Sequence, residues 1–356
     1  MACTDPQRVL RVGTSGDYAP FSLDGEGFDI EVARLLAAEL DARIEWVPFL
    51  WPALAANVAT NRFDVAMSGV TWRPERAVVG WMTRAVASGG PCVLGDPEPE
   101  RLGVNEGGIL ERWARQRFSS AEIRAVADNR SLPELLVTGE VDAIVTDSFE
   151  LAHFRRPNFP EHCEPASERK VYWVTPAAAP ELGPAIDRFL REREAELDAL
   201  RERHFGRRAE RAEVDHLIDL LARRLALMPA VAAWKRELRE PISDPAREEL
   251  VLARAAAQAH EAGIEIEAAR RLFEIQIELA KAVQGRALDA EPLDLERELR
   301  PALLRLGDRI VASLARAAPL EPGALAGRRL APLASLLEPN ETELLRRALL
   351  DVRPAP

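Results

Sequence analysis

Basic side chains recur at helical spacing in the C-terminal part of the chain. Arg224 and Lys235 are 11 residues apart, which is nearly three whole turns of an α-helix, so both project from one side. Arg247 follows Lys235 by twelve residues, beyond a proline-rich break. Taken singly, each is more often a solvated charge on an exposed helix face. Together they could surround an anion and stabilise negative charge that develops during a reaction.

Two acidic residues follow an apolar, strand-like run in the N-terminal part, namely Asp147 and Glu150. A carboxylic acid can protonate a leaving group only if it keeps its proton near neutral pH, which requires burial or apolar neighbours. Phe149, Leu151 and Phe154 flank Glu150 and could provide such neighbours. The alternative is a solvated glutamate at a helix start, where acidic side chains are favoured in any case.

The elements that must position the acidic pair alternate between short β-rich runs and amphipathic helical patterns. Strands are expected at 9–12, 44–47, 65–68, 91–94, 143–146 and 171–174, and helices at 28–40, 51–60 and 133–138. This alternation predicts an α/β domain with a largely parallel sheet.

The elements that carry the basic residues are of a different kind. Six of the seven Trp and both Tyr precede residue 174, whereas only Trp234 and Phe273 follow Gly206. Apolar residues at steps of three and four predict one long helix over 214–238. Further helices are expected at 245–263, 266–284, 299–317 and 330–350. We therefore expect an all-α domain after a boundary at 206–211.

Bulk composition limits the classes of partner. A length of 356 residues favours two domains. The net charge of −11 argues against nucleic acid or an anionic membrane surface as a partner. No apolar run approaches the roughly 20 residues that span a bilayer, and no signal peptide precedes the first strand-like segment. Cys92 and Cys163 could pair in an oxidising compartment or remain unrelated thiols, and Cys3 could carry a lipid or lie in a plain N-terminal tail.

Three motifs resemble type II periplasmic amino-acid-binding proteins. They are GTSGDYAPF at 13–21, GFDIEVA at 27–33 and FDVAMSGVT at 63–71. The resemblance implies a two-lobed α/β fold in which Ser68, Thr71 and Arg76 bind a ligand carboxylate. The chemistry suits the role, because an arginine offers a bidentate fork to a carboxylate and hydroxyls complete its shell. For Arg76 the alternative is a surface arginine after a turn.

Within that superfamily, residues 8–206 resemble cyclohexadienyl dehydratases, and the segment VDAIVTDSFE at 141–150 carries most of the likeness. The resemblance implies that Asp147 occupies the place that binds a ligand ammonium in amino-acid binders. It also implies that Glu150 is a general acid, which protonates the departing ring hydroxyl of prephenate or arogenate. Substrate-binding roles are implied for Asp17, Trp51, Asn105 and Asn129. Ile109-Leu110 stands where the family often has Thr-Asn after Gly107-Gly108, so the choice between the two substrates stays open.

From residue 214 the chain resembles the secreted, gamma class of helical chorismate mutases. The pericyclic rearrangement of chorismate needs no metal or cofactor, only a compact substrate and stabilised charge on its ether oxygen. The resemblance assigns Arg224, Arg247 and Arg300 to the substrate carboxylates, Lys235 and Gln284 to the ether oxygen, and Glu248 to the ring hydroxyl. Two positions depart from the pattern, since Ala280 replaces a hydroxyl residue and Val251 replaces a polar one.

Together the two resemblances predict a bifunctional, exported enzyme of phenylalanine biosynthesis, with no cofactor and no metal. The expected layout is a tail at 1–7, a dehydratase domain at 8–206, a linker at 207–213 and a mutase domain at 214–356. The expected partners are chorismate, prephenate and arogenate, with no nucleic acid, no transmembrane segment and a homodimer through the helical domain. One alternative joins the mutase to a non-catalytic amino-acid receptor. Another makes the helical domain an inactive dimerisation module.

Overall fold

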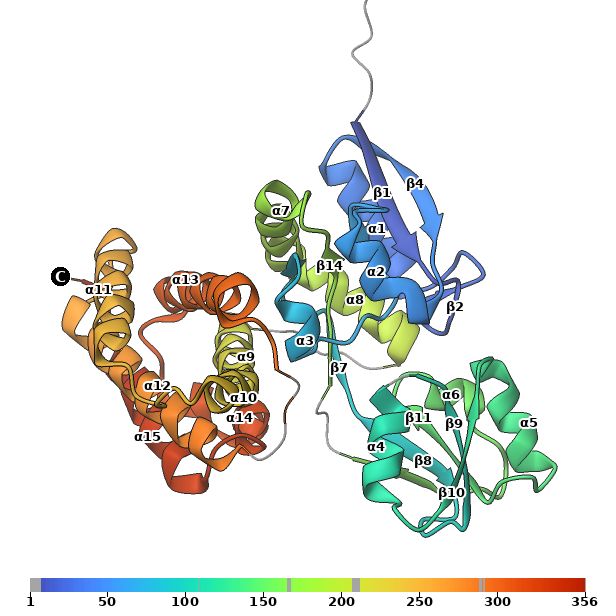
Figure 1. Cartoon of the computed structure of the whole chain (residues 1–356). Helices are drawn as coiled ribbons and strands as arrows, with labels where there is room; N and C mark the ends of the chain where they lie inside the picture. Colours follow the sequence, from blue (N-terminus) through green and yellow to red (C-terminus); the bar gives the residue numbers. More distant parts are fainter. Residues whose placement is uncertain are drawn as a thin grey trace, which may run out of the picture. The chain divides into compact units, whose positions relative to one another are not determined.

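The computed structural model describes residues 8–107, 109–164, 168–206, 212–287, 290 and 292–355. The expected tail 1–7 with Cys3, the glycine at 108, and residues 207–211 of the expected linker lie outside the described residues. The chain divides into two compact units (Figure 1). The first comprises Met1–Trp72 and Gly80–Glu210, and the second comprises Arg73–Val79 and Arg211–Pro356.

The first lobe of the first unit is built on a five-stranded sheet with the order β4-β1-β5-β14-β6. Its strands are β1 (Arg8–Thr14), β4 (Ala42–Pro48), β5 (Val65–Ala66), β6 (Trp81–Met82) and β14 (Trp173–Val174). Its helices are α1 (Phe28–Glu39), α2 (Leu54–Ala59), α7 (Ala179–Glu192) and α8 (Glu194–Phe205). Phe28, Val32 and Leu36 recur every fourth residue of α1 and are fully buried, so one apolar stripe fixes this helix to the core.

The second lobe is built on another five-stranded sheet, with the order β10-β9-β11-β8-β12. Its strands are β8 (Pro91–Gly95), β9 (Arg101–Asn105), β10 (Glu122–Val126), β11 (Ala143–Asp147) and β12 (Glu161–Cys163). Its helices are α4 (Ile109–Arg117), α5 (Leu132–Val137) and α6 (Leu151–Phe154). The antiparallel pair β7 (Ala87–Gly89) and β13 (Glu168–Lys170) lies where the chain passes between the lobes.

Both sheets are mixed. β4, β1 and β5 run parallel in the first sheet, and β10, β9 and β11 run parallel in the second. β14 runs antiparallel to both β5 and β6 in the first sheet, and β8 runs antiparallel to both β11 and β12 in the second. The predicted two-lobed α/β class is confirmed. The strand expected at 171–174 is shorter, because Trp173–Val174 alone pairs in the first sheet.

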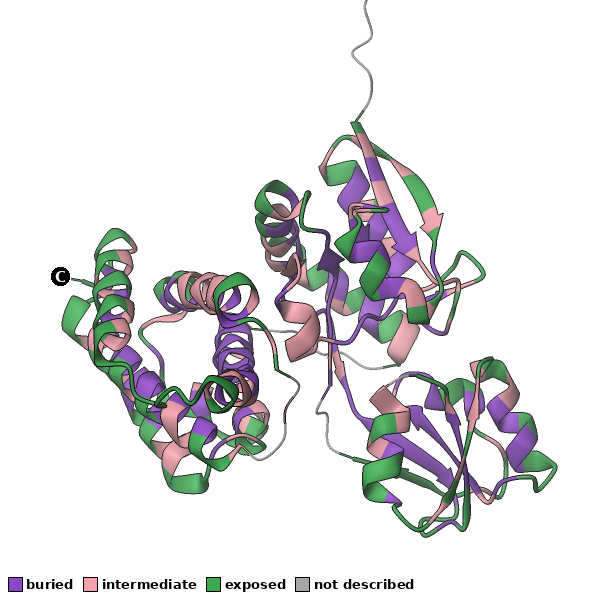
Figure 2. Ribbon diagram, viewed as in Figure 1, coloured by how far each residue is buried: buried purple, intermediate pink, exposed green. Residues whose placement is uncertain are grey.

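The second unit is helical. Its helices are α9 (Glu213–Ala226), α10 (Met228–Leu238), α11 (Pro245–Glu261), α12 (Ile266–Arg286), α13 (Arg300–Ala317), α14 (Ala331–Ala334), α15 (Pro339–Asp351) and the short α3 (Pro74–Ala77). The Asp244 carboxylate caps α11 by accepting a 3.1 Å hydrogen bond from the Arg247 amide, with Pro245 at the first helical position. Within each unit the buried residues concentrate on the sheets and on the inner faces of the helices (Figure 2).

Two segments that were each expected to be continuously helical are interrupted in the structure. The helix expected over 214–238 ends at Ala226, and α10 begins at Met228. The segment expected over 330–350 is divided between α14 and α15, which begins at Pro339. Pro229 and Pro339 explain both breaks, because proline lacks the N–H that a helix interior requires and is tolerated only in a first turn.

A disulfide joins Cys92 of β8 to Cys163 of β12, which lie opposite each other in the sheet. Cys92 also lies opposite Thr146 of the neighbouring strand β11. The disulfide therefore links the edge strand β12 to β8, and β8 is the neighbour of β11, the strand that carries Asp147. Among the described residues, no helix is both long and apolar enough to cross a membrane.

Candidate active sites

Glu150 lies at the start of α6, directly after the turn that follows β11, and only 4% of its surface is exposed. The Asn129 amide donates a 2.6 Å hydrogen bond to its carboxyl group, and the Thr146 hydroxyl donates one of 2.9 Å. The alternative of a solvated glutamate at a helix start is therefore excluded. Asn129, expected to bind substrate, instead contacts the expected acid in this structure.

Burial first, and the neighbouring Asp147 carboxylate second, raise the pKa of Glu150 to about 8. The flanking side chains Phe149, Leu151 and Phe154 are all buried, as the sequence suggested. Because a pKa near 8 leaves the carboxyl group mostly protonated at neutral pH, Glu150 can donate a proton there.

Asp147 is buried as deeply as Glu150 but accepts more hydrogen bonds and has a cationic neighbour. Its Oδ1 accepts hydrogen bonds from the backbone amides of Phe149 (2.8 Å) and Glu150 (2.9 Å). Its Oδ2 accepts one from the Tyr18 hydroxyl and lies 3.2 Å from the Lys170 ammonium. Burial alone would raise the pKa of Asp147, but Lys170 and these donors hold it below its usual value.

Lys170, on β13, is a site residue that the sequence reasoning missed. Only 3% of it is exposed. Its ammonium donates to the Thr71 hydroxyl at 3.0 Å, lies 3.4 Å from Glu168 Oε2, and sits 5.1 Å from the centre of the Tyr18 ring. The signal in the sequence was a lysine directly before the apolar run 171–174, where burial is expected. A buried lysine almost always has a charged or polar partner, so a paired lysine could have been predicted here.

The other residues expected to bind the dehydratase substrate have the following surroundings. Ser68 is buried against the hydroxyls of Ser15 and Ser22. The Trp51 indole donates a 3.2 Å hydrogen bond to Asp17 Oδ1, and Asn105 ends β9. Arg76 lies on α3, in the segment that groups with the second unit, and its carboxylate-binding role stays a prediction.

The second unit contains a cavity of about 160 Å³ that is lined by side chains of α9 to α13 and of the segments between them. All six residues that the sequence assigned to the mutase site line it, namely Arg224, Lys235, Arg247, Glu248, Gln284 and Arg300. The lining also includes Arg254 and Lys281, which were not expected. Six cationic side chains face three carboxylates in this lining, so the cavity is locally basic in an acidic chain.

Polar groups in the cavity are left without partners. Arg224 is only 7% exposed, and its Nη1 has no hydrogen-bond partner among the described residues. Burial lowers the pKa of Arg224 to about 10. The Gln284 Oε1 is likewise buried without a partner in the described part of the chain, while its Nε2 donates to the Ala280 carbonyl at 3.3 Å. Buried groups of this kind are normally satisfied, so we interpret them as groups kept for a ligand.

The remaining expected residues are held by local contacts. The Lys235 ammonium donates to the Ile242 carbonyl at 2.6 Å, and burial lowers the pKa of Lys235. Glu248 Oε2 lies 3.3 Å from the Lys281 ammonium, and Arg300 pairs with Glu296.

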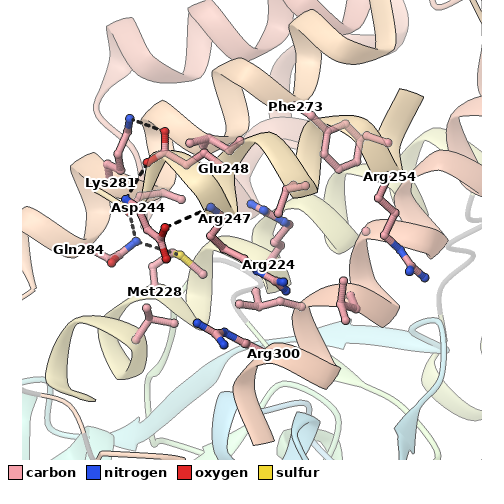
Figure 3. Close-up of a pocket in the computed structure, with 18 of the residues that line it drawn as sticks. Arg224, Met228, Asp244, Arg247, Glu248, Arg254, Phe273, Lys281, Gln284 and Arg300 are labelled. Atoms are coloured by element: carbon pink, nitrogen blue, oxygen red, sulfur yellow. Dashed lines mark hydrogen bonds and ion pairs between the residues drawn. The ribbon is translucent and has the colours of Figure 1, made fainter. Parts of the chain in front are cut away.

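Figure 3 shows Arg224, Arg247 and Arg300 reaching the same cavity from α9, α11 and α13. Three guanidinium groups from three helices can bind two carboxylates of one small molecule. The described residues contain no cluster of three or more His, Cys, Asp or Glu side chains that could hold a metal ion.

The two-lobed fold defines the class of the first unit. Residues 10–207 match the bacterial extracellular solute-binding proteins, family 3, and the chain belongs to this family. Residues 208–285 match chorismate mutase type II. The chain therefore joins a solute-binding domain to a chorismate mutase type II domain, and both resemblances noted in the sequence are confirmed.

Curated relatives match the first unit. Cyclohexadienyl dehydratase of Pseudomonas aeruginosa is 35% identical over 174 residues, which are 44% of this chain and 65% of the relative. An L-cystine-binding protein of Escherichia coli is 28% identical over 156 residues, which are 39% of this chain and 59% of the relative. The chain thus spans less than two thirds of the length of either relative.

Solved structures confirm the fold of that unit alone. A binding component of an ABC transporter from Wolinella succinogenes, complexed with lysine, aligns with a TM-score of 0.51 at 21% identity, over 56% of this chain and 96% of that chain. An ancestral arginine-binding protein bound to glutamine gives 0.50 at 22% identity, over 57% of this chain and all of that chain.

The buried Arg224, whose Nη1 has no partner among the described residues, leads to a stability prediction. Arg224→Met removes a buried charge and keeps most of the side-chain volume, so the free energy of unfolding should rise by about 1–2 kcal/mol. Urea denaturation followed by circular dichroism measures the change. The matched control is Arg297→Met, because Arg297 is 87% exposed and should change stability by less than about 0.5 kcal/mol. Destabilisation by Arg224→Met would show that the guanidinium serves the fold rather than a ligand.

Proposed function

We propose that the chain catalyses two consecutive reactions. The helical unit rearranges chorismate to prephenate, and the two-lobed unit converts prephenate or arogenate to phenylpyruvate or phenylalanine. The observation that carries the proposal is Glu150, a buried carboxyl group with a pKa of about 8 beside Asp147. An amino-acid receptor has no use for a proton donor at this place, whereas a dehydratase requires one.

In the dehydration step, Glu150 transfers its proton to the ring hydroxyl of the substrate, which leaves as water. The bond to the ring carboxylate breaks at the same time, CO₂ departs, and its electron pair completes the aromatic ring. Aromatisation supplies much of the driving force, so the protein mainly orients the substrate and delivers one proton. Glu150 then recovers a proton from solvent. Ser68, Thr71, Arg76, Asn105, Asp17 and Trp51 are proposed to hold the substrate.

In the rearrangement step, the ether C–O bond breaks while a C–C bond forms within one cyclic array of electrons. No atom leaves the substrate and no proton is transferred. Arg224, Arg247 and Arg300 bind the two carboxylates and hold the compact conformation. The Lys235 ammonium and the Nε2 amide of Gln284 stabilise the negative charge on the ether oxygen, where preorganised donors contribute most. Glu248 binds the ring hydroxyl. These roles require neither metal nor cofactor.

The setting of these reactions is also proposed. Relatives of the first unit include the lysine/arginine/ornithine-binding periplasmic protein of Escherichia coli, and the chain contains a disulfide. Because disulfides persist in oxidising compartments, both observations support an exported protein. We also propose a homodimer that forms through the helical unit.

A second candidate function is an amino-acid receptor fused to the mutase. The similarity to the L-cystine-binding protein favours it, as does Asp147 at the expected ammonium position. Calorimetric titration with cystine, arginine and phenylalanine separates the candidates, because a receptor binds one of them and leaves prephenate unchanged.

The general acid gives the first functional prediction. Glu150→Gln should lower kcat/KM for prephenate dehydration by about 10²-fold or more, as loss of a general acid does. In the unaltered protein the protonated form is active, so kcat/KM should fall as pH rises through about 8. Formation of phenylpyruvate measures both effects. Glu134→Gln, at an exposed position of α5, is the matched control. An unchanged rate in the Glu150 variant removes the assignment.

The proposed role of Lys235 in the mutase site gives the second functional prediction. Lys235→Ala should lower kcat for chorismate by about 10²–10³-fold, because it removes charge stabilisation from the transition state. Dehydration of added prephenate should be unaffected, since Lys235 lies in the other unit. The exposed Arg297→Ala serves as the control for loss of a cation in the helical unit. A mild effect on chorismate turnover would show that Lys235 does not reach the ether oxygen.

A further inference from the structure

Two buried carboxyl groups lie three residues apart in the first unit, and the charge of one raises the pKa of the other. Asp147 is 3% exposed and Glu150 is 4% exposed, and the backbone amide of Glu150 itself donates to Asp147. Two adjacent carboxylates cannot both ionise without strong repulsion in a medium of low polarity. The pair therefore holds one proton near neutral pH, and catalysis by Glu150 requires that this proton lie on Glu150.

The surroundings of the two groups are unequal. Asp147 receives two backbone amides, the Tyr18 hydroxyl and the Lys170 ammonium. Glu150 receives the neutral Asn129 amide and the Thr146 hydroxyl. A cation within hydrogen-bonding distance stabilises the ionised form of a carboxyl group more than neutral donors do. Lys170 also lowers the pKa of Glu150, but burial and the Asp147 charge raise it by more. The asymmetry therefore favours a charge on Asp147.

We propose that Lys170 is a positioning residue that keeps Asp147 ionised, so that the charge on Asp147 keeps the neighbouring Glu150 protonated. The inference deepens the proposed dehydration and rests on it. Lys170 need not touch the substrate, because it acts through Asp147. Pairs of carboxyl groups whose surroundings separate their proton affinities commonly divide the roles of acid and counter-charge in this way.

The other charged groups around the pair agree with this assignment. Tyr18 contacts Asp147 from β2 (Asp17–Tyr18), and burial and then the Asp147 charge keep its pKa well above the usual value, so it stays a neutral donor. Glu168, on β13 with Lys170, lies 3.4 Å from the ammonium and balances part of its charge. Burial opposes the charge on Lys170, but Asp147 and Glu168 raise the pKa of Lys170 above its usual value. The ammonium therefore remains charged throughout the relevant pH range.

The position of Lys170 suits a residue that keeps the Asp147 carboxylate ionised. β13 pairs with β7 where the chain passes between the lobes, and Lys170 also donates to Thr71, which follows β5 of the first lobe. The ammonium is thereby fixed by Thr71, Glu168 and Asp147 rather than free to rotate. A fixed cation can bias a proton equilibrium without the energetic cost of reorganisation.

Lys170→Met tests the inference in the full chain. Without the ammonium, Asp147 takes up a proton more readily, and a neutral Asp147 no longer raises the pKa of Glu150, so a smaller fraction of the protein carries a protonated Glu150. Dehydration of prephenate at pH 7 should fall by about tenfold or more. Activity should recover in part at acid pH, where both carboxyl groups are protonated. The kcat/KM profile should therefore move to lower pH, whereas a merely structural loss lowers the rate equally at every pH.

Two further variants keep the test decisive. Lys170→Arg keeps the cation and should restore most of the activity and the original profile. Tyr18→Phe removes a neutral donor from Asp147 and should move the profile in the same direction by a smaller amount, which provides a result even if the methionine variant does not fold. A rate lowered with an unchanged profile in both Lys170→Met and Tyr18→Phe overturns the inference.

A readout independent of turnover separates this inference from the proposed function. Carbon-13 NMR of protein labelled at the glutamate carboxyl carbon follows the Glu150 signal, which is identified by its absence in Glu150→Gln. In the unaltered protein that signal should report a protonated group at pH 7, and in Lys170→Met an ionised fraction. If the protein does not turn over prephenate but the signal behaves in this way, only the proposed function fails. If prephenate is consumed and the signal is the same in both proteins, only the role of Lys170 fails.

Discussion

Burial of Glu150 beside Asp147 is the interaction on which the chemistry of the first unit depends. Water would stabilise both carboxylates and leave neither with a proton at neutral pH. The fold excludes water from both and gives Asp147 the stronger set of donors, so the pKa values of the two groups diverge in opposite directions. β11 delivers Asp147, the turn after it delivers Glu150, and the disulfide closes the sheet beside that strand.

In the helical unit the buried charge is positive, because its cavity keeps arginine and lysine side chains partly away from water. Arg224 is buried with one nitrogen unpartnered among the described residues, and the Gln284 oxygen is in the same condition. Such groups destabilise the empty protein. The carboxylates of a dianionic ligand would satisfy Arg224, and a hydroxyl group of that ligand could donate to the Gln284 oxygen. The first unit would thus keep a proton for its reaction, and the second unit would keep cations for its reaction.

Local patterns in the sequence predicted the parts of the structure that depend on local spacing. Arg224 and Lys235 line one cavity as their separation predicted, even though α10 begins a new helix between them. Lys170 was missed because its partners Asp147 and Thr71 are distant in sequence and meet it only through sheet topology. The pairing of Cys92 with Cys163 stayed open for the same reason, since only the register of β12 against β8 brings the two together.

The account predicts that one chain carries chorismate through two reactions, and a single time course tests this most directly. The purified full-length protein is mixed with chorismate alone, and chorismate, prephenate and phenylpyruvate are quantified by liquid chromatography. We expect chorismate to decline, prephenate to rise and then fall, and phenylpyruvate to accumulate in an amount equal to the chorismate consumed. Prephenate that accumulates to completion without phenylpyruvate, beyond the slow background conversion, would contradict the account of the first unit.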